Sequence, residues 1–404
     1  MGTKRLNELA EGMVLATDLK TSDGRLLFKA GTPIQARHVE LLGRMGVEAA
    51  DVVETVELTA GQLREIEDYV RYFFLYTNPD FAPTIEMFRI ALDQVADAVA
   101  GGWTLPDLSR RRAANVEHLE DLFIAGMGTP ETIVRHEAGL ASFPDIYFRI
   151  REVLEDENAT AEAIARVVST DISLSAKLLR LVNSPFYGFP QEIDSVSRAV
   201  ALVGTRELST LALGISAINY FRDIPPELVD MRSFWRHSIT CGVIAKILAD
   251  TQTGLASERF FTAGLLHDVG RLILFKKLPY ACTEAMLYAR ENAIPLVEAE
   301  REILGFDHTD ISRPLLLSWK FPEALSSMIN CHHDPMAFPN PLEPSVIHVA
   351  DTLTNVVELA QGGMYAIPAL RQEAWAELGL EPEALRRVVD ECREQIEAIL
   401  EAFL

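Results

Sequence analysis

From about residue 58 to the C-terminus, apolar residues recur with the spacing of amphipathic helices. Leu63, Ile66 and Val70 form one such stripe, and after Phe143-Pro144 one helical segment follows another to the end of the chain. Turn-forming sequences such as Asn183-Ser184-Pro185 separate the segments. The pattern therefore predicts a mainly α protein built from many helices.

The first residues differ from the rest. Met13–Leu19 and Arg25–Lys29 are short strand-like runs around Asp23-Gly24, a sequence typical of a tight hairpin turn. A helix over residues 35–45 and a third strand over residues 47–53 are expected to follow. These features predict a small α+β module.

The length of 404 residues is enough for two or three domains. We expect the α+β module over residues 1–57, a helical middle region or linker over 58–139, and a helical domain with further C-terminal helices over 140–404. The middle region should contain helices near 84–99 and 115–125. Residues 140–404 are expected to fold without the N-terminal part.

Charge and cysteine content restrict the function. The 59 acidic against 37 basic residues give a net charge of −22, which repels nucleic-acid phosphates and anionic membranes. A polar N-terminus and the lack of a run of about 20 apolar residues predict neither a signal peptide nor a membrane span. Four widely spaced cysteines without a CxxC pair fit a reducing compartment, so we expect a cytoplasmic protein; they are Cys241, Cys282, Cys331 and Cys392.

Six of the nine histidines lie between residues 237 and 348, among acidic residues. Imidazole and carboxylate groups together suit iron, manganese, nickel or zinc. Seven ligands would be enough for two ions, and such a pair can bind a phosphate and activate a water. The candidate ligands are His237, His267, Asp268, His308, His332, His333 and Asp351.

Each candidate also has a simpler interpretation. A single histidine on a helix is usually a hydrogen-bonded residue, and His332-His333 would also suit a helix C-terminus. His348 shares a helix face with Asp351, where it would contact a ligand or, less favoured, be one. The metal interpretation is favoured because His267-Asp268 follows an apolar helix, and a buried Asp needs a partner.

The segment over residues 174–208 resembles a known domain family. It reads LSAKLLRLVNSPFYGFPQEIDSVSRAVALVGTREL, which is similar to the signature of the HDOD domain. The order His, His-Asp, His, His-His, Asp further along resembles the HD superfamily of metal-dependent phosphohydrolases in its HD-GYP form. The likeness is strong over residues 140–340. The N-terminal module, from Gly12 to Thr32, resembles the small domain that often precedes HD-GYP domains.

The resemblance implies an HD-like multi-helix fold and a division of the ligands between two metals. One metal would take His237, His267, Asp268 and Asp351. The other would share Asp268 and add three histidines, namely His308, His332 and His333. Iron or manganese is favoured, and nickel or zinc would also suit the set. HDOD domains commonly lack some ligands and act in signalling, whereas this chain has a ligand-type residue at every position.

The chain departs from the hydrolases in two places. Arg271 stands where HD-GYP proteins have Lys; it keeps the charge and can bind phosphate but cannot transfer a proton. The sequence after His333 lacks the acidic and Gly-Tyr-Pro elements. We therefore expect a signalling or regulatory protein with a metal-binding site.

The alternative is an active metal-dependent phosphohydrolase or phosphodiesterase with Asp268 and Arg271 as catalytic residues. The expected partner is a signalling protein or a small phosphorylated ligand such as a nucleotide. Neither a nucleic acid nor a membrane is expected as a partner, and a homo-oligomer is compatible with the sequence.

Overall fold

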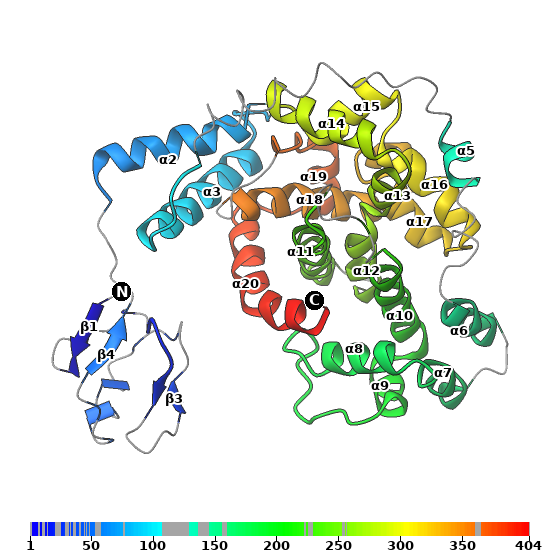
Figure 1. Ribbon diagram of the computed structural model, residues 1–404, viewed down its shortest axis with the longest axis horizontal. Helices are drawn as coiled ribbons and strands as arrows, with labels where there is room; N and C mark the ends of the chain where they lie inside the picture. Colours follow the sequence, from blue (N-terminus) through cyan, green and yellow to red (C-terminus); the bar gives the residue numbers. More distant parts are fainter. Residues whose placement is uncertain are drawn as a thin grey trace. The chain divides into compact units, whose positions relative to one another are not determined.

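The computed structural model in Figure 1 divides into two compact units, residues 1–68 with 93–105, and residues 69–92 with 106–404. It describes residues 2–6, 9, 13, 15–20, 26–28, 32, 34, 38–39, 42–43, 45, 47, 49–52, 58–75, 77–106, 129–135, 145–155, 160–221, 224, 229–252, 255, 257–359 and 365–403. The Asp23-Gly24 turn, the helix expected near 115–125 and Phe143-Pro144 lie outside these residues.

The N-terminal unit contains two small antiparallel sheets. Strand β1 (Gly2–Arg5) pairs with β4 (Ala49–Val52), with Gly2 opposite Val52. Strand β2 (Leu19–Lys20) pairs with β3 (Leu26–Phe28) across an irregular register. Buried apolar side chains join these strands into one core, made by Leu9, Leu15, Leu19, Ile34, Leu42 and Ala50.

The sequence predicted three of these four strands. β4 lies within the expected 47–53 and β3 lies within the predicted run Arg25–Lys29, whereas β2 overlaps the predicted run Met13–Leu19 only at Leu19. β1 was missed because its sequence, GTKR, is polar. It pairs through its backbone, which the side-chain pattern does not reveal.

The remaining described chain is helical, which confirms a mainly α fold with a small α+β N-terminal part. Helices α2 and α3 cover the start of this region, and the others follow after residue 129. The helices are α2 (Ala60–Phe73), α3 (Ala82–Ala100), α5 (Pro130–Arg135), α6 (Asp145–Glu155), α7 (Ala161–Val168), α8 (Ile172–Val182), α9 (Val196–Val203), α10 (Thr205–Tyr220), α11 (Met231–Asp250), α12 (Glu258–Leu266), α13 (Val269–Lys277), α14 (Pro279–Asn292), α15 (Leu296–Leu304), α16 (His308–Ser318), α17 (Glu323–Asn330), η4 (Pro335–Ala337), α18 (Leu342–Glu358), α19 (Gln372–Leu378) and α20 (Ala384–Phe403).

Local sequence sets the ends of several helices. The Thr160 side chain caps α7 by accepting a hydrogen bond from the backbone N–H of Ala163. After α8, the Asn183 side chain accepts from the backbone N–H of Ile193 and donates to the Ile193 carbonyl, at 2.7 and 2.8 Å. Asn183 therefore closes the loop that the sequence marked as a helix stop.

Helix α11 lies at the centre of the second unit, against α12, α18 and α20 (Figure 1). Its crossing with α12 depends on two glycines. A Cβ at Gly242 would lie 2.6 Å from the Phe261 carbonyl oxygen, and one at Gly264 would lie 2.6 Å from the Gly242 Cα. Because any side chain would separate the helices, glycine at both positions keeps His237 of α11 near His267, which follows α12.

Residues 69–92 belong to the same unit as the C-terminal helices. The backbone N–H of Ile367 donates to the Phe73 carbonyl at 2.9 Å, and the Arg386 side chain donates to Glu86 at 3.1 Å. All four cysteines carry free thiols. None of the helices described here combines the length and apolarity that a membrane crossing needs.

Candidate metal centre

The seven candidate ligands come from five places in the helical unit. His237 lies in α11, His267-Asp268 lies between α12 and α13, and His308 opens α16. The other three are His332 and His333, which follow α17, and Asp351 in α18. The structure brings all seven side chains together, whereas their ligation of a metal stays a prediction.

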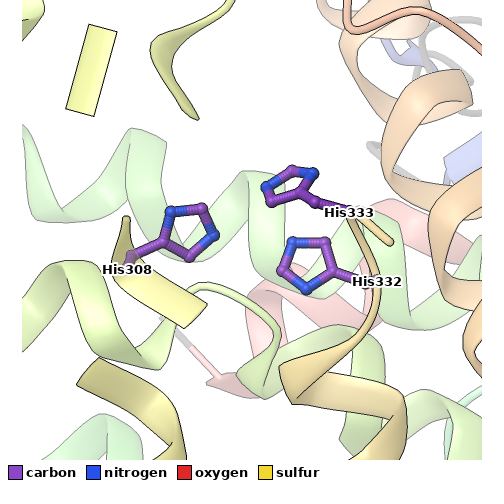
Figure 2. Close-up of side chains that lie close together, drawn as sticks. All are labelled: His308, His332 and His333. Carbon is purple, nitrogen blue, oxygen red and sulfur yellow. The ribbon is translucent and has the colours of Figure 1, made fainter. Parts of the chain in front are cut away.

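One group consists of three histidines. The rings of His308, His332 and His333 face one another in Figure 2. One nitrogen from each lies within 4.8 Å of the others, which is close enough to bind one ion. Ring centres are 5.0 Å apart for His308 and His333 and 4.0 Å apart for His332 and His333.

A second group lies beside the first. His237, His267 and Asp268 also offer one ligand atom each within 4.8 Å of one another, and so do His267, His332 and Asp351. The Oδ1 atom of Asp351 is 3.3 Å from Nε2 of His237 and 3.6 Å from Nε2 of His267. Asp351 therefore belongs with His237 and His267.

Asp268 lies between the two groups. Its Oδ1 atom is 3.1 Å from Nε2 of His308, and its Oδ2 atom is 3.5 Å from Nε2 of His267. One carboxylate oxygen thus faces each group, which is the arrangement of a carboxylate that bridges two ions.

Several buried polar atoms at this centre make no hydrogen bond to any residue that the structure describes. They are Nε2 of His267, His308, His332 and His333 and Oδ1 of Asp268. Leaving such atoms unpaired costs about 1–3 kcal/mol each, so native proteins rarely do so without a ligand. The donor set and these unpaired atoms fit one or more divalent metal ions.

The opposite ring nitrogens are held by acceptors. Nδ1 of His267 lies 2.6 Å from the Gly264 carbonyl oxygen, and Nδ1 of His332 lies 2.7 Å from that of Ile329. A carbonyl only accepts, so Nδ1 carries a hydrogen in both rings and Nε2 is the nitrogen left to bind a metal, after loss of its proton in the case of His267. This tautomer is the one that a metal ligand bonded through Nε2 requires.

Carboxylates hold the other two histidines. Nδ1 of His308 lies 2.5 Å from Glu300, and Nδ1 of His237 lies 2.9 Å from Glu358. Neither glutamate was singled out from the sequence. Glu358 stands seven residues after Asp351 on the same helix face, a spacing that could have identified it.

A comparison with protein-family models matches residues 140–335 to the HDOD domain. The protein contains an HDOD domain. This match confirms the resemblance to the HDOD domain that the sequence indicated. The matched residues include His237, His267, Asp268 and the three histidines of Figure 2. Asp351 lies beyond the matched residues, in α18.

Relatives of this HDOD protein share its fold. The crystal structure of a proposed phosphohydrolase from Shewanella amazonensis SB2B has a TM-score of 0.54 and 22% identity, covering 69% of this chain and 100% of that one. An HDOD domain protein of unknown function from Geobacter sulfurreducens has a TM-score of 0.53 and 21% identity, and the match covers 74% of this chain and 100% of that one. A proposed signal transduction protein from Marinobacter aquaeolei VT8 has a TM-score of 0.51 and 22% identity, and the match covers 73% of this chain and 64% of that one.

One curated protein provides a sequence relative. An uncharacterised protein of Treponema pallidum (strain Nichols) is 24% identical over 213 residues, which are 52% of this chain and 41% of that protein. The match therefore spans less than half of the relative's length.

Arg271 of the HDOD domain is engaged by two carboxylates. Its guanidinium group forms an ion pair with Asp268, and its Nε donates to Glu300 at 2.8 Å. The sequence suggested that Arg271 could bind a phosphate. In the structure the Arg271 side chain is mostly buried, and Asp268 and Glu300 balance its charge. Its role is therefore to pair with these two acids inside the centre.

Charge divides the histidines of the HDOD domain into two classes. Burial opposes a charge on His237, but Glu358 and Asp351 outweigh it and raise the pKa of His237 to about 10. Burial and Arg271 oppose a charge on His308, yet Glu300 and Asp268 raise its pKa to about 9. Burial, with His267 and His308 nearby, lowers the pKa of His332 to about 3.

His348 contacts the centre without joining it. Its Nδ1 donates to the His332 carbonyl at 2.8 Å, and its Nε2 accepts from the backbone N–H of Arg371 at 3.1 Å. Both ring nitrogens are therefore occupied. This leaves no lone pair for a metal and agrees with the favoured role of His348 as a contact to a ligand.

Proposed function

We propose that the HDOD domain binds two divalent metal ions, iron or manganese by preference, and that the protein is a signalling or regulatory protein whose binding of a partner depends on that metal. The observation that carries the proposal is the set of unpaired buried atoms on Asp268 and four histidines, all within one centre. Ion pairing with Asp268 accounts for part of the set, at His267 and His308, whereas Nε2 of His332 and of His333 makes no hydrogen bond to any residue that the structure describes.

His237, His267 and Asp351 would hold one ion, and the three histidines of Figure 2 would hold the other, with Asp268 shared. Two such ions, when bound, would supply a phosphate-binding position and would lower the pKa of a bound water to about 7. The backbone carbonyls and glutamates on the Nδ1 atoms orient the rings for this role.

The residues around the centre favour a regulatory role over turnover. Hydrolysis needs groups that hold the substrate in line and stabilise the leaving oxygen. Arg271 is committed to Asp268 and Glu300. The chain after His333 reads Asp-Pro-Met-Ala-Phe-Pro. It contains no basic residue that could hold the substrate or stabilise the leaving oxygen in place of Arg271. A signalling protein, or a small phosphorylated ligand such as a nucleotide, is the proposed partner.

Metal analysis of the purified full-length protein tests this function. The protein is stripped with a chelator, reloaded with Fe²⁺ or Mn²⁺, and compared with Asp268→Ala and with Asp250→Ala, which removes an exposed carboxylate of α11 that pairs with Lys246. We expect two ions per chain in the wild type and in Asp250→Ala, and at most one in Asp268→Ala. Equal metal content in all three proteins would contradict the proposed site.

The second candidate function is a metal-dependent phosphohydrolase or phosphodiesterase. The position of Asp268 between the two groups favours it, because two-metal hydrolases use this arrangement. A generic phosphodiester and a cyclic dinucleotide, assayed with metal-loaded protein, separate the two functions. We expect weak or absent turnover. Turnover of about 1 per second or more, lost in Asp268→Ala, would establish the enzyme instead.

A further inference from the structure

Two glutamates outside the ligand set contact one histidine in each group. Glu300 of α15 is buried, and its Oε2 atom accepts from both Nδ1 and the backbone N–H of His308, at 2.5 and 3.1 Å. Glu358 at the end of α18 is partly exposed, and its Oε2 atom lies 2.9 Å from Nδ1 of His237. The two contacts are made to histidines of different groups.

The two groups are supported in the same way. Each contains one histidine that donates to a backbone carbonyl, His267 in one and His332 in the other. Each also contains one histidine that donates to a carboxylate, His237 in one and His308 in the other. When Nδ1 donates its hydrogen to a carboxylate, Nε2 is a more basic metal ligand than when Nδ1 donates to a carbonyl. The two glutamates therefore make one histidine nitrogen in each group a stronger metal ligand.

We propose that Glu358 and Glu300 are positioning residues that each fix one histidine for one metal position, so that the two positions can be weakened separately. The proposal rests on the metal binding proposed above. It adds that the two halves of the centre are supported by different acids from different helices.

The surroundings of the two acids predict effects of different size. Both oxygens of Glu300 accept, one from His308 and the other from Arg271 Nε at 2.8 Å. A glutamine at this position would turn an N–H₂ group toward one of those donors. At position 358 a glutamine can still accept from His237 through its oxygen and loses only the charge. Glu300→Gln should therefore have the larger effect.

The test measures Co²⁺ binding by full-length, chelator-stripped protein. Stoichiometry comes from metal analysis after gel filtration, affinity from competition with a chelator, and ligand environment from the visible absorption of Co²⁺. The variants are Glu300→Gln and Glu358→Gln. The matched control is Glu302→Gln, which removes the same charge from an exposed position of α15.

We expect the wild type and Glu302→Gln to bind two ions. Each test variant should keep one ion at wild-type affinity and bind the other about 10- to 100-fold more weakly. The absorption lost should differ between the variants, because one position has three histidines and the other has two histidines and Asp351. A change in folding alone would not produce two different spectra.

Circular dichroism of the metal-free proteins checks folding. Glu358→Gln keeps the test decisive if Glu300→Gln fails to fold, since Glu358 is partly exposed. Two ions at wild-type affinity in Glu358→Gln would overturn the proposal, and so would parallel loss of both ions. A wild type that binds fewer than two ions would overturn the proposed function and this proposal with it, whereas unchanged variants of a two-ion wild type would overturn this proposal alone.

Discussion

Gly270 packs directly on the backbone of His308. A Cβ at Gly270 would lie 2.0 Å from the His308 carbonyl oxygen. The Gly270 backbone N–H donates to the Ser312 hydroxyl at 3.1 Å, and that hydroxyl donates to the His308 carbonyl at 3.0 Å. Because Gly270 follows Asp268 by two residues, this contact fixes the His-Asp pair against the first turn of α16.

Gly270→Ala should therefore damage both stability and metal binding. The atom in the way belongs to the backbone and cannot rotate aside, so we expect a loss of about 3 kcal/mol or more in the free energy of unfolding, at or above the upper end for an overpacked core. Denaturant unfolding and metal analysis measure the two effects. The control is Gly61→Ala in α2, where a Cβ meets its nearest atom at 3.8 Å. It should be neutral or stabilising by up to about 1 kcal/mol.

Substitutions of His348 should reduce stability without removing metal. His348→Leu leaves the Arg371 N–H and the His332 carbonyl without their partner, which should cost about 1–3 kcal/mol. His348→Asn retains a donor near the Nδ1 position and should cost less. Both should bind two ions. Loss of an ion from His348→Asn, with normal unfolding, would mean that His348 is a ligand.

Metal binding should release protons near neutral pH. The pKa values of about 10 for His237 and about 9 for His308 lie above the ordinary value, so in the metal-free protein at pH 7 both ring nitrogens of each histidine are protonated and the ring is positively charged. Ligation needs the deprotonated ring, and metal affinity should rise as the pH approaches these values. Burial opposes a charge on His267 as well, but Asp268 and Asp351 raise its pKa well above the ordinary value. Calorimetry in buffers of different ionisation heat should therefore detect about three protons released per chain at pH 7. Release of none would contradict the assignment of these three histidines.

Residues 69–92 should stabilise the HDOD domain. Tyr69 and Phe73 are buried, and the Tyr69 hydroxyl donates to the Leu359 carbonyl at 3.4 Å. A chain of residues 58–404 should unfold cooperatively. A chain of residues 140–404 should unfold at lower temperature, because each buried apolar side chain it lacks contributes about 1.5–3 kcal/mol. Equal melting temperatures would show that the domain boundary predicted at residue 140 is sufficient by itself.

The local features of this protein could be predicted from its sequence. Helix α8 ends at Val182, just before the Asn183-Ser184-Pro185 turn expected from the sequence, and α7 begins after Thr160, a residue type that commonly caps helices. These features depend on residues within one or two turns of each other, through capping bonds and the periodic placement of apolar side chains. The identity of the candidate ligands was also readable, because His and Asp are recognisable by type and order.

The support of the centre depended on the tertiary structure. Glu358 meets His237 across 121 positions, and Glu300 meets Arg271 across 29. Such pairs form only when separate helices pack. The spacing of Glu358 from Asp351 places both on one helix face, but it does not specify which of the chain's 59 acidic residues will be near a particular histidine. The same packing placed Glu300 against Arg271 and occupied both ring nitrogens of His348. The sequence alone determined which residue types were available for a metal site, and helix packing decided which of them face it, because distance and burial are properties of the folded chain.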